Sequence, residues 1–340
     1  MKAAVYYSNS DVRVEEMPVP EIGTGEMLLK VMASGICGSD VMEWYRIKKA
    51  PLVLGHEVAG VVERVGEGVE RFQAGDRVTV AHHVPCNTCR FCLRGEFSVC
   101  DTLRSTNFFP GGFAQFLRVP AINVDRGTFT LPPDMSFEEA TFAEPLGCVV
   151  RGLRKAGFTA GKTLLVLGSG ISGLLHIKLA RALGASAVAA TDINETRLKM
   201  AEAAGADFVF NASLDVPDMV TRSLGRPADI VAICAGSSKA VKQAIDSVER
   251  AGTLLFFAPG QPGETYPMPL FELWRDNITI INTYASPPAD TLTALDLMAG
   301  NTVDVSDMIT HRLGINDAAE GFDLVSEAGQ SIKVIIEPNA

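Results

Sequence analysis

Basic residues are in short supply in this 340-residue chain, which carries 30 lysines and arginines against 40 aspartates and glutamates, a formal net charge of −10. Nucleic-acid binding draws mainly on Lys and Arg against phosphate, so this balance argues against a nucleic-acid partner. Long apolar runs are also missing, since none approaches the roughly 18 residues that a membrane-spanning helix needs. Polar residues follow soon after Met1. We therefore expect a cytoplasmic protein without membrane contact that acts on a small molecule.

Cysteine is sparse, and its number is odd, at seven. Four of the seven fall within residues 86–100. Because no secretory signal is recognisable, this clustering favours metal binding over a framework of disulfides. The chain is also longer than a single hydrophobic core usually grows, and it contains no internal repeat, so we expect two domains.

The clustered residues Cys86, Cys89, Cys92 and Cys100 have the spacing C-x2-C-x2-C-x7-C. Four thiolates at such spacing can close on one tetrahedral zinc ion with no open position, which is typical of a structural site. An iron–sulfur cluster is the alternative. The ferredoxin run, however, has three residues before its last cysteine and a proline after it, whereas this chain has seven residues and then Asp101. We interpret the array as a structural zinc lobe.

A second set of potential ligands is spread along the chain. His56 and Glu57 stand side by side, Cys37 lies nineteen residues before His56, and Glu144 follows far downstream. Three such ligands with one open position are typical of a catalytic zinc site. The alternative is that His56 is a buried histidine and Cys37 an inert small hydrophobe. Both Glu57 and Glu144 fit as the third ligand, and we favour Glu57, since Gly55 can supply the turn that directs two neighbouring side chains at one ion.

The pattern of secondary structure changes along the chain. Residues 1 to about 85 read as a β-rich region with closed, barrel-like packing, and strands are predicted at 12–15, 27–31, 58–65 and 77–80. From about residue 150, strands and helices alternate, as in a parallel sheet covered by helices on both faces. Six strands are predicted there, at 163–167, 187–192, 208–210, 229–234, 253–257 and 278–281. A helix at 292–298 and a last strand at 333–336 form a tail that we expect to return to the first domain.

A glycine-rich turn follows the strand at 163–167 and opens an amphipathic helix, which is the context of a dinucleotide-binding motif. The residues that we expect to contact the cofactor are Gly168, Gly170, Ile171, Ser172, Gly173, Asp192 and Arg197. The glycines let the backbone approach the pyrophosphate at the helix N-terminus. Asp192 can accept hydrogen bonds from the ribose hydroxyls and would repel a 2′-phosphate, so the motif predicts NAD. Arg197 is the one nearby cation that could favour NADP.

These motifs occur in the order seen in the zinc-dependent medium-chain dehydrogenases, and the chain resembles most the sorbitol (L-iditol 2-) dehydrogenase branch of that family. The motifs are Cys37-Gly-Ser-Asp, Gly55-His-Glu, the four-cysteine lobe, Gly111-Gly-Phe-Ala, Ala143-Glu-Pro-Leu, Gly168-x-Gly-x-x-Gly and Tyr284-Ala-Ser-Pro. The resemblance covers essentially the whole chain. It implies an α/β protein with a GroES-like catalytic domain, residues 1–148 and 284–340, and a Rossmann NAD-binding domain, residues 149–283.

The resemblance also implies an activity. It implies NAD-dependent interconversion of a secondary alcohol, for which we favour a polyol, and a ketone, in a homodimer or homotetramer with one catalytic and one structural Zn²⁺ per chain. Zinc held by Cys37, His56 and a carboxylate would act as a Lewis acid on the substrate oxygen. Ser39 matches the hydroxyl that starts the family's proton relay. Many relatives carry a histidine five residues after the zinc cysteine, where this chain has Met42.

Other functions fit parts of the pattern. Within the family, the substrate could be threonine, a diol, a cyclic alcohol or a sugar phosphate. A zinc-free quinone or enoyl reductase of the same fold is disfavoured by the intact set of Cys37, His56 and Glu144. From another class comes a non-catalytic, zinc-bearing interaction protein, against which the complete nucleotide motif and the acidic charge argue.

Overall fold

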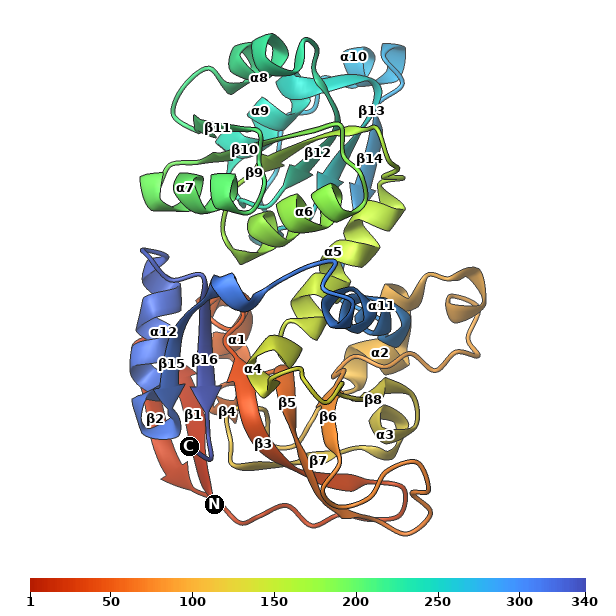
Figure 1. The fold of residues 1–340 in the computed structure, drawn as a ribbon, viewed down its shortest axis with the longest axis vertical. Coiled ribbons are helices and arrows are strands. Elements are labelled where there is room, and N and C mark those ends of the chain that lie inside the picture. Colours follow the sequence, from red (N-terminus) through yellow and green to blue (C-terminus); the bar gives the residue numbers. More distant parts are fainter. The chain divides into compact units, whose positions relative to one another are not determined.

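The computed structural model describes residues 1–340, which divide into two compact units. Unit 1 comprises Met1–Gly147 and Ala285–Ala340, and unit 2 comprises Cys148–Tyr284. Unit 1 is built on mixed and antiparallel sheets, and unit 2 on a parallel sheet with helices (Figure 1). The predicted fold class, a β-rich domain combined with a doubly wound domain, is confirmed. None of the helices is both long and apolar enough to span a membrane.

Unit 1 contains ten strands: β1 (Lys2–Ser8), β2 (Asp11–Glu16), β3 (Met27–Gly35), β4 (Leu52–Val53), β5 (Glu57–Val65), β6 (Arg77–Val80), β7 (Phe116–Val119), β8 (Thr128–Thr130), β15 (Ile309–Gly314) and β16 (Lys333–Glu337). Its helices are α1 (Glu43–Arg46), α2 (Asp101–Ser105), α3 (Ala121–Gly127), α4 (Phe137–Ala140), α11 (Pro288–Ala299) and α12 (Ala318–Glu327). Helix α5 (Ala143–Lys155) contains the division between the two units.

Strand β3 organises the main sheet of unit 1, whose order is β15-β16-β3-β5-β6-β8. One edge of β3 pairs with β5 along its length. The other edge is shared, because its first half pairs with β7 and its last two residues pair with β16. The pairing is therefore branched and leaves β15 and β8 as ends, which corrects our expectation of a closed barrel. A separate three-stranded sheet has the order β2-β1-β4.

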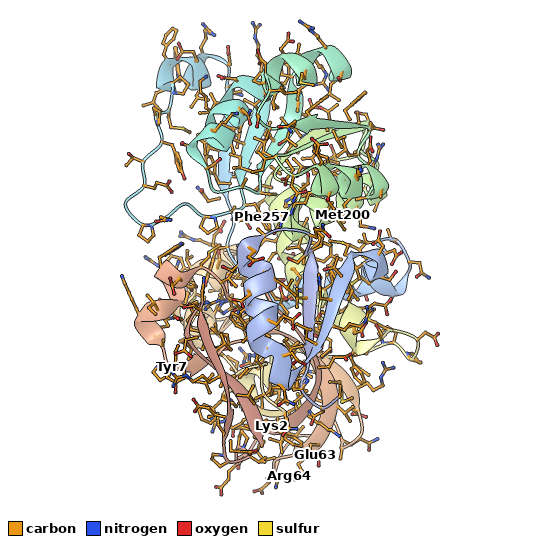
Figure 2. All side chains as sticks on the ribbon, turned by 90° about the vertical axis from the view of Figure 1, so that its left-hand side faces the viewer. Lys2, Tyr7, Glu63, Arg64, Met200 and Phe257 are labelled. Carbon is orange, nitrogen blue, oxygen red and sulfur yellow. The ribbon has the colours of Figure 1, made fainter.

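Residues from both ends of the chain share one core in unit 1. Tyr6 from β1 and Phe322 from α12 are both fully buried, with ring centroids 5.7 Å apart, and Phe113 packs edge-on against Phe322. At the outer end of β5, by contrast, Glu63 and Arg64 are exposed (Figure 2). The C-terminal strand β16 reaches the centre of the sheet through β3, so its side chains lie next to residues that are 300 positions earlier in sequence.

Unit 2 has the strand order β11-β10-β9-β12-β13-β14, with every neighbouring pair parallel. The strands are β9 (Thr163–Leu167), β10 (Ala187–Asp192), β11 (Phe208–Asn211), β12 (Ala228–Ile233), β13 (Val248–Phe256) and β14 (Thr279–Asn282). The helices are α6 (Ile171–Ala182), α7 (Glu195–Ala203), α8 (Val216–Leu224), α9 (Ser238–Ser247) and α10 (Leu270–Arg275). Helices α6 and α7 cover one face of this sheet, and α8 and α9 cover the other (Figure 1). Since both faces are covered, β9 is buried at every residue, as its continuous apolar sequence predicts.

His176 on α6 is a fully buried histidine in unit 2. Its Nδ1 donates to the Ser172 carbonyl at 2.7 Å, and its ring stands edge-on to Phe257 with centroids 4.7 Å apart. Nε2 has no hydrogen-bond partner. Burial lowers the pKa of His176 from 6.5 to about 4, since the interior disfavours the charged ring. The folded protein therefore holds this ring neutral across the pH range in which an exposed histidine would become charged.

Because of His176, the free energy of unfolding should decrease as the pH falls. In the unfolded chain His176 binds a proton below pH 6.5, whereas in the folded chain it does so only below about pH 4. The free energy of unfolding should therefore be about 2 kcal/mol lower at pH 5 than at pH 7.5. A His176→Asn variant keeps a donor for the Ser172 carbonyl and cannot titrate. Urea unfolding of both proteins at the two pH values measures the difference. Parallel pH profiles would show that His176 does not carry the effect.

Candidate metal centres and cofactor site

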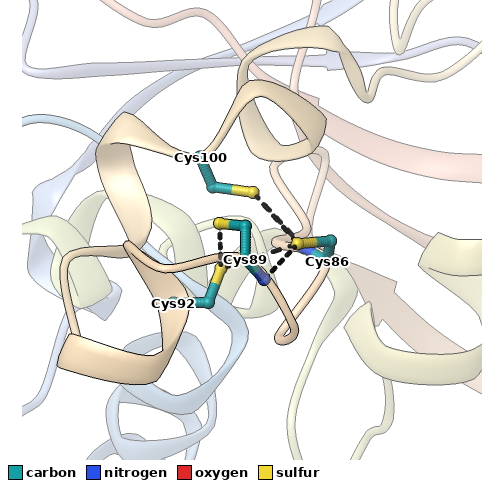
Figure 3. Close-up of side chains that lie close together, drawn as sticks. All are labelled: Cys86, Cys89, Cys92 and Cys100. Carbon is teal, nitrogen blue, oxygen red and sulfur yellow. Dashed lines mark hydrogen bonds between the residues drawn. The ribbon is translucent and has the colours of Figure 1, made fainter.

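The four predicted cysteines converge in the lobe formed by residues 86–100. Their sulfur atoms all lie within 4.8 Å of one another, with separations of 3.9 Å for Cys86 and Cys92, 3.5 Å for Cys89 and Cys92, and 3.7 Å for Cys100 and Cys86 (Figure 3). Tetrahedral coordination with Zn–S bonds of about 2.3 Å places sulfur atoms about 3.8 Å apart. The lobe therefore has the dimensions of a single-ion site, and sulfurs this close leave no room for an iron–sulfur cluster.

The ionisation of these thiols also fits a bound cation. Hydrogen bonds from the side chain and backbone of Thr88 and from the Cys89 N–H lower the pKa of Cys86 to about 5, which favours the thiolate that binds metals. Burial and the neighbouring thiols raise the pKa of Cys92 to about 12. Without a cation the four thiols cannot all ionise, whereas a divalent ion favours the thiolate at every one of them.

The second group of ligands is also brought together. The ligand atoms of Cys37, His56 and Glu57 lie within 4.8 Å of one another in unit 1. Gly55 has φ of +92°, and a side chain there would crowd the backbone of Phe113, so this position requires glycine. His56 precedes β5, which begins at Glu57. Because the chain turns at this point, the two neighbouring side chains can face the same site, as the sequence predicts.

A buried carboxylate orients His56. Asp40 is fully buried, and its Oδ1 lies 3.4 Å from His56 Nδ1, which leaves Nε2 for a metal. The other oxygen of Asp40 accepts from the Cys37 backbone N–H at 3.1 Å. Burial disfavours a charged ring, but Asp40 and Cys37 raise the pKa of His56 well above 6.5. The same negative surroundings that favour a proton on this ring would favour a metal cation beside it.

Glu57 has a second partner from the far end of the chain. Its carboxylate forms a buried ion pair with Lys333 on β16, whose side chain is fully enclosed and also lies over the ring of Phe142. A side chain at Gly35 would overlap both members of this pair, so the glycine makes room for it. Burial raises the pKa of Glu57, Lys333 lowers it, and the nearby Glu144 raises it again. The charge of Lys333 therefore compensates the carboxylate of Glu57, which is one of several charged groups at this site.

Glu144, near the start of α5, is not part of the three-ligand group. It lies close enough to Glu57 to affect its pKa. Ser39, the predicted relay hydroxyl, accepts a hydrogen bond from Arg46 Nη2 at 2.9 Å, and Arg46 Nε donates to the Ser39 carbonyl at 2.9 Å. An arginine, rather than the histidine that many relatives carry five residues after the zinc cysteine, therefore contacts this serine.

In unit 2, the glycine-rich turn has the shape that a dinucleotide needs. Gly168 has φ of +98°, and a side chain at Gly173 would overlap the Gly168 carbonyl oxygen. At Gly170, by contrast, an added Cβ would meet only Arg197 Nη1, at 3.8 Å. Ile171 and Ser172 form the first turn of α6, whose N-cap offers no side-chain hydrogen bond. The open space at the uncapped helix N-terminus fits a pyrophosphate.

Asp192 ends β10, as predicted, and is buried. Its carboxylate accepts from the backbone N–H of Ser169 at 2.8 Å and from that of Asn194 at 2.9 Å. These two hydrogen bonds connect the glycine-rich turn to the end of β10 and hold the carboxylate of Asp192 in place. Arg197 on α7 places its guanidinium near Gly170, and its Nε is buried without a hydrogen-bond partner. Asp192 and Arg197 therefore both lie next to the glycine-rich turn.

Three residues beside Cys37, His56 and Glu57 have no role in the site that the sequence predicts. Asp40 was part of the Cys37 motif but had no assigned role. Lys333 was read only as the first residue of the last strand, although a single lysine in the apolar run Ile332–Ile336 is a detectable anomaly. His82 packs against His56 with ring centroids 4.7 Å apart and ring planes tilted by 51°, and only the rare His-His pair at 82–83 could have indicated it.

Comparison with known proteins covers both units. Residues 23–126 match the family described as alcohol dehydrogenase GroES-like domain, and residues 172–300 match the family described as zinc-binding dehydrogenase. Sorbitol dehydrogenase of Ovis aries is 32% identical, over 98% of this chain and 95% of the relative.

Two solved structures are similar over their full length. Galactitol-1-phosphate dehydrogenase from Escherichia coli has a TM-score of 0.87 and 30% identity, covering 99% of this chain and 100% of that one. A zinc-binding dehydrogenase from Sinorhizobium meliloti 1021, bound to NADP, has a TM-score of 0.87 and 28% identity, covering 99% of both chains.

Proposed function

This chain belongs to the zinc-dependent medium-chain dehydrogenase family, and we propose that it oxidises a secondary hydroxyl of a polyol to a ketone with NAD as the hydride acceptor. As a member of this family it is an oxidoreductase that uses zinc and a nicotinamide cofactor. The choice of a polyol is supported by the sheep sorbitol dehydrogenase, which is similar to the chain from end to end. A non-catalytic interaction protein is not supported, because both of the matched families are dehydrogenase families.

The observation that carries the proposal is the convergence of Cys37, His56 and Glu57 on one point in unit 1. A sulfur, a nitrogen and a carboxylate oxygen form a ligand set that zinc accepts, and three protein ligands leave one position for a substrate. When bound, the zinc supplies a Lewis acid for the substrate oxygen and the nicotinamide supplies a hydride acceptor. In the lobe, Cys86, Cys89, Cys92 and Cys100 would hold a second zinc with no open position.

The chain's own residues prepare this site in three ways. Asp40 contacts Nδ1 of His56, which leaves Nε2 available to bind the metal. Ser39 Oγ accepts from Arg46, which leaves the hydroxyl proton free to be donated to a substrate oxygen. A guanidinium cannot take up a proton at ordinary pH, so Arg46 holds Ser39 in place but does not continue a proton relay.

A substrate screen tests the proposed function. Purified protein should be assayed with NAD and four groups of alcohols: polyols with and without a phosphate, amino-acid alcohols such as threonine, simple diols, and cyclic alcohols. The absorbance of the reduced nicotinamide reports turnover. Polyols should give the highest kcat/KM. A preference for a phosphorylated sugar alcohol, the substrate named for the Escherichia coli relative, would replace the polyol within the same chemistry.

The cofactor preference should depend on Asp192. Its buried carboxylate would repel a 2′-phosphate, so the unmodified protein should prefer NAD. Asp192→Ser should move the ratio of the two kcat/KM values toward NADP by about 10-fold or more, equivalent to about 1.4 kcal/mol. Because Asp192 also accepts two backbone hydrogen bonds, the Tm of the variant must be measured alongside. Arg197→Leu is the matched variant, and it should reduce any residual use of NADP. Equal use of both cofactors by the unmodified protein would show that Arg197 overrides the carboxylate.

We also propose that two copies associate through the edge of the unit 2 sheet. Strand β14 is the last strand of that sheet, and β14 and the preceding helix α10 expose large apolar side chains. These are Leu270, Phe271, Trp274 and Ile280. An exposed apolar patch beside a free strand edge is typical of an interface with a second copy. Sedimentation of the protein and of a Trp274→Glu variant tests this; a monomeric unmodified protein would contradict it.

A further inference from the structure

His82 is the histidine next to the catalytic metal group that the proposed chemistry does not use. It follows β6 by two residues and is only 9% exposed. Its ring contacts those of His56, at a centroid distance of 4.7 Å, and His83, at 3.8 Å, with Phe108 edge-on at 6.3 Å. Its backbone carbonyl accepts a hydrogen bond from Asn123 at 3.0 Å, which fixes the segment.

The ring of His82 makes these contacts and no hydrogen bond. Nδ1 is buried without a partner. The neighbouring ring differs, because His83 is hydrogen-bonded to the backbone of Leu103. A buried polar group without a partner is costly, and such groups in native proteins are usually satisfied by water or by a ligand. His82 is thus a polar side chain held in place beside a metal ligand, with its hydrogen-bonding capacity unused by the protein.

We propose that His82 is a substrate-binding residue that hydrogen-bonds the hydroxyl next to the reacting carbinol, so that the site selects vicinal diols and polyols over simple alcohols. The inference rests on the proposed function of the site. When a vicinal diol binds at the metal position through one oxygen, its second hydroxyl is on the neighbouring carbon. The ring of His82 is adjacent to that of the metal ligand His56, so it can reach this second hydroxyl. A neutral imidazole offers one donor and one acceptor, which matches a hydroxyl group.

The surroundings of His82 increase the selectivity that this contact can give. The ring is enclosed by other rings, and a hydrogen bond shielded from water is stronger than an exposed one. An alcohol without the second hydroxyl would leave the imidazole unpaired in the bound complex. Sites built to bind a substrate hydroxyl reject analogues that lack it much more strongly than apolar sites distinguish substrates by size.

The test compares two substrates that differ by one hydroxyl, butane-2,3-diol and butan-2-ol, on the zinc-loaded protein with NAD. His82→Phe keeps a ring in contact with His56 and His83 and removes the hydrogen bond. It should lower kcat/KM for the diol by about 10- to 100-fold, mainly through KM, and change that for butan-2-ol by less than about 3-fold. His82→Gln, which restores a donor and an acceptor, should recover part of the preference. His83→Phe is the matched control, and it should affect both substrates equally.

Two further readouts separate the inference from the proposed function. Zinc content should be the same in the unmodified protein and in His82→Phe, and the diol should enhance or quench the fluorescence of bound NADH only in the unmodified protein. Equal losses on the two substrates, an unchanged preference, or loss of zinc from His82→Phe would each overturn the role of His82. If instead the unmodified protein oxidised neither alcohol and no polyol, the proposed function itself would fail.

Discussion

Replacing Glu57 with Gln should release the catalytic zinc, whereas replacing Glu144 with Gln should leave it bound. Glu57 belongs to the group whose ligand atoms lie within 4.8 Å of one another, and Glu144 does not. Losing a direct ligand weakens retention of the metal, while losing a neighbouring carboxylate mistunes the site and costs roughly 10- to 100-fold in affinity or activity. The zinc content should therefore fall from about two to about one per chain in Glu57→Gln only.

This expectation is checked by measuring the zinc content of protein that has never been exposed to a chelator, together with kcat/KM on the same samples. Cys89→Ser is the matched control for the other site, because it should lose the lobe zinc and reduce folding yield while leaving Cys37, His56 and Glu57 intact. Loss of zinc from Glu144→Gln but not from Glu57→Gln would reverse the assignment. Full activity in either variant would remove that residue from the site.

The strands and turns that the sequence predicted correctly are those encoded by short patterns. The run Thr163–Leu167 and the glycines at 168, 170 and 173 form β9 and the turn into α6, because buried parallel strands and close backbone approaches impose local requirements. The four-cysteine array is likewise local, and its spacing brings the sulfur atoms together. The family, the fold class and the use of zinc and a nicotinamide cofactor are confirmed.

Contacts between distant segments could not be predicted in the same way. Nothing near Glu57 in the sequence indicates Lys333, which reaches it only because β16 pairs with the end of β3. His82 stands beside His56 because β6 pairs with β5, and its role depends on a ring contact that no spacing encodes. The expected closed barrel was wrong for a similar reason, since the sharing of one edge of β3 between β7 and β16 depends on where the C-terminal strand docks.

Zinc should restore most of the stability that the protein loses when Lys333 is removed from its buried pair with Glu57. Both side chains are almost completely buried, so removing one charge leaves the other uncompensated. In metal-free protein, Lys333→Met should therefore lower the free energy of unfolding by about 3–5 kcal/mol. With zinc bound, the metal's charge can compensate Glu57 in place of the lysine, so most of this loss should be recovered.

A double-mutant cycle isolates the pair. Adding Glu57→Gln to Lys333→Met removes the uncompensated carboxylate, and the metal-free double variant should be more stable than Lys333→Met alone. Denaturant unfolding of the unmodified protein, the two single variants and the double variant, all metal-free, completes the cycle, and unfolding of the unmodified protein and Lys333→Met with zinc bound shows whether zinc restores the loss. If the two single changes simply add in metal-free protein, then Glu57 and Lys333 do not compensate one another, and another group balances the carboxylate. If zinc fails to restore Lys333→Met, then Glu57 is directed away from the metal, and Cys37 and His56 must be completed by a different third ligand.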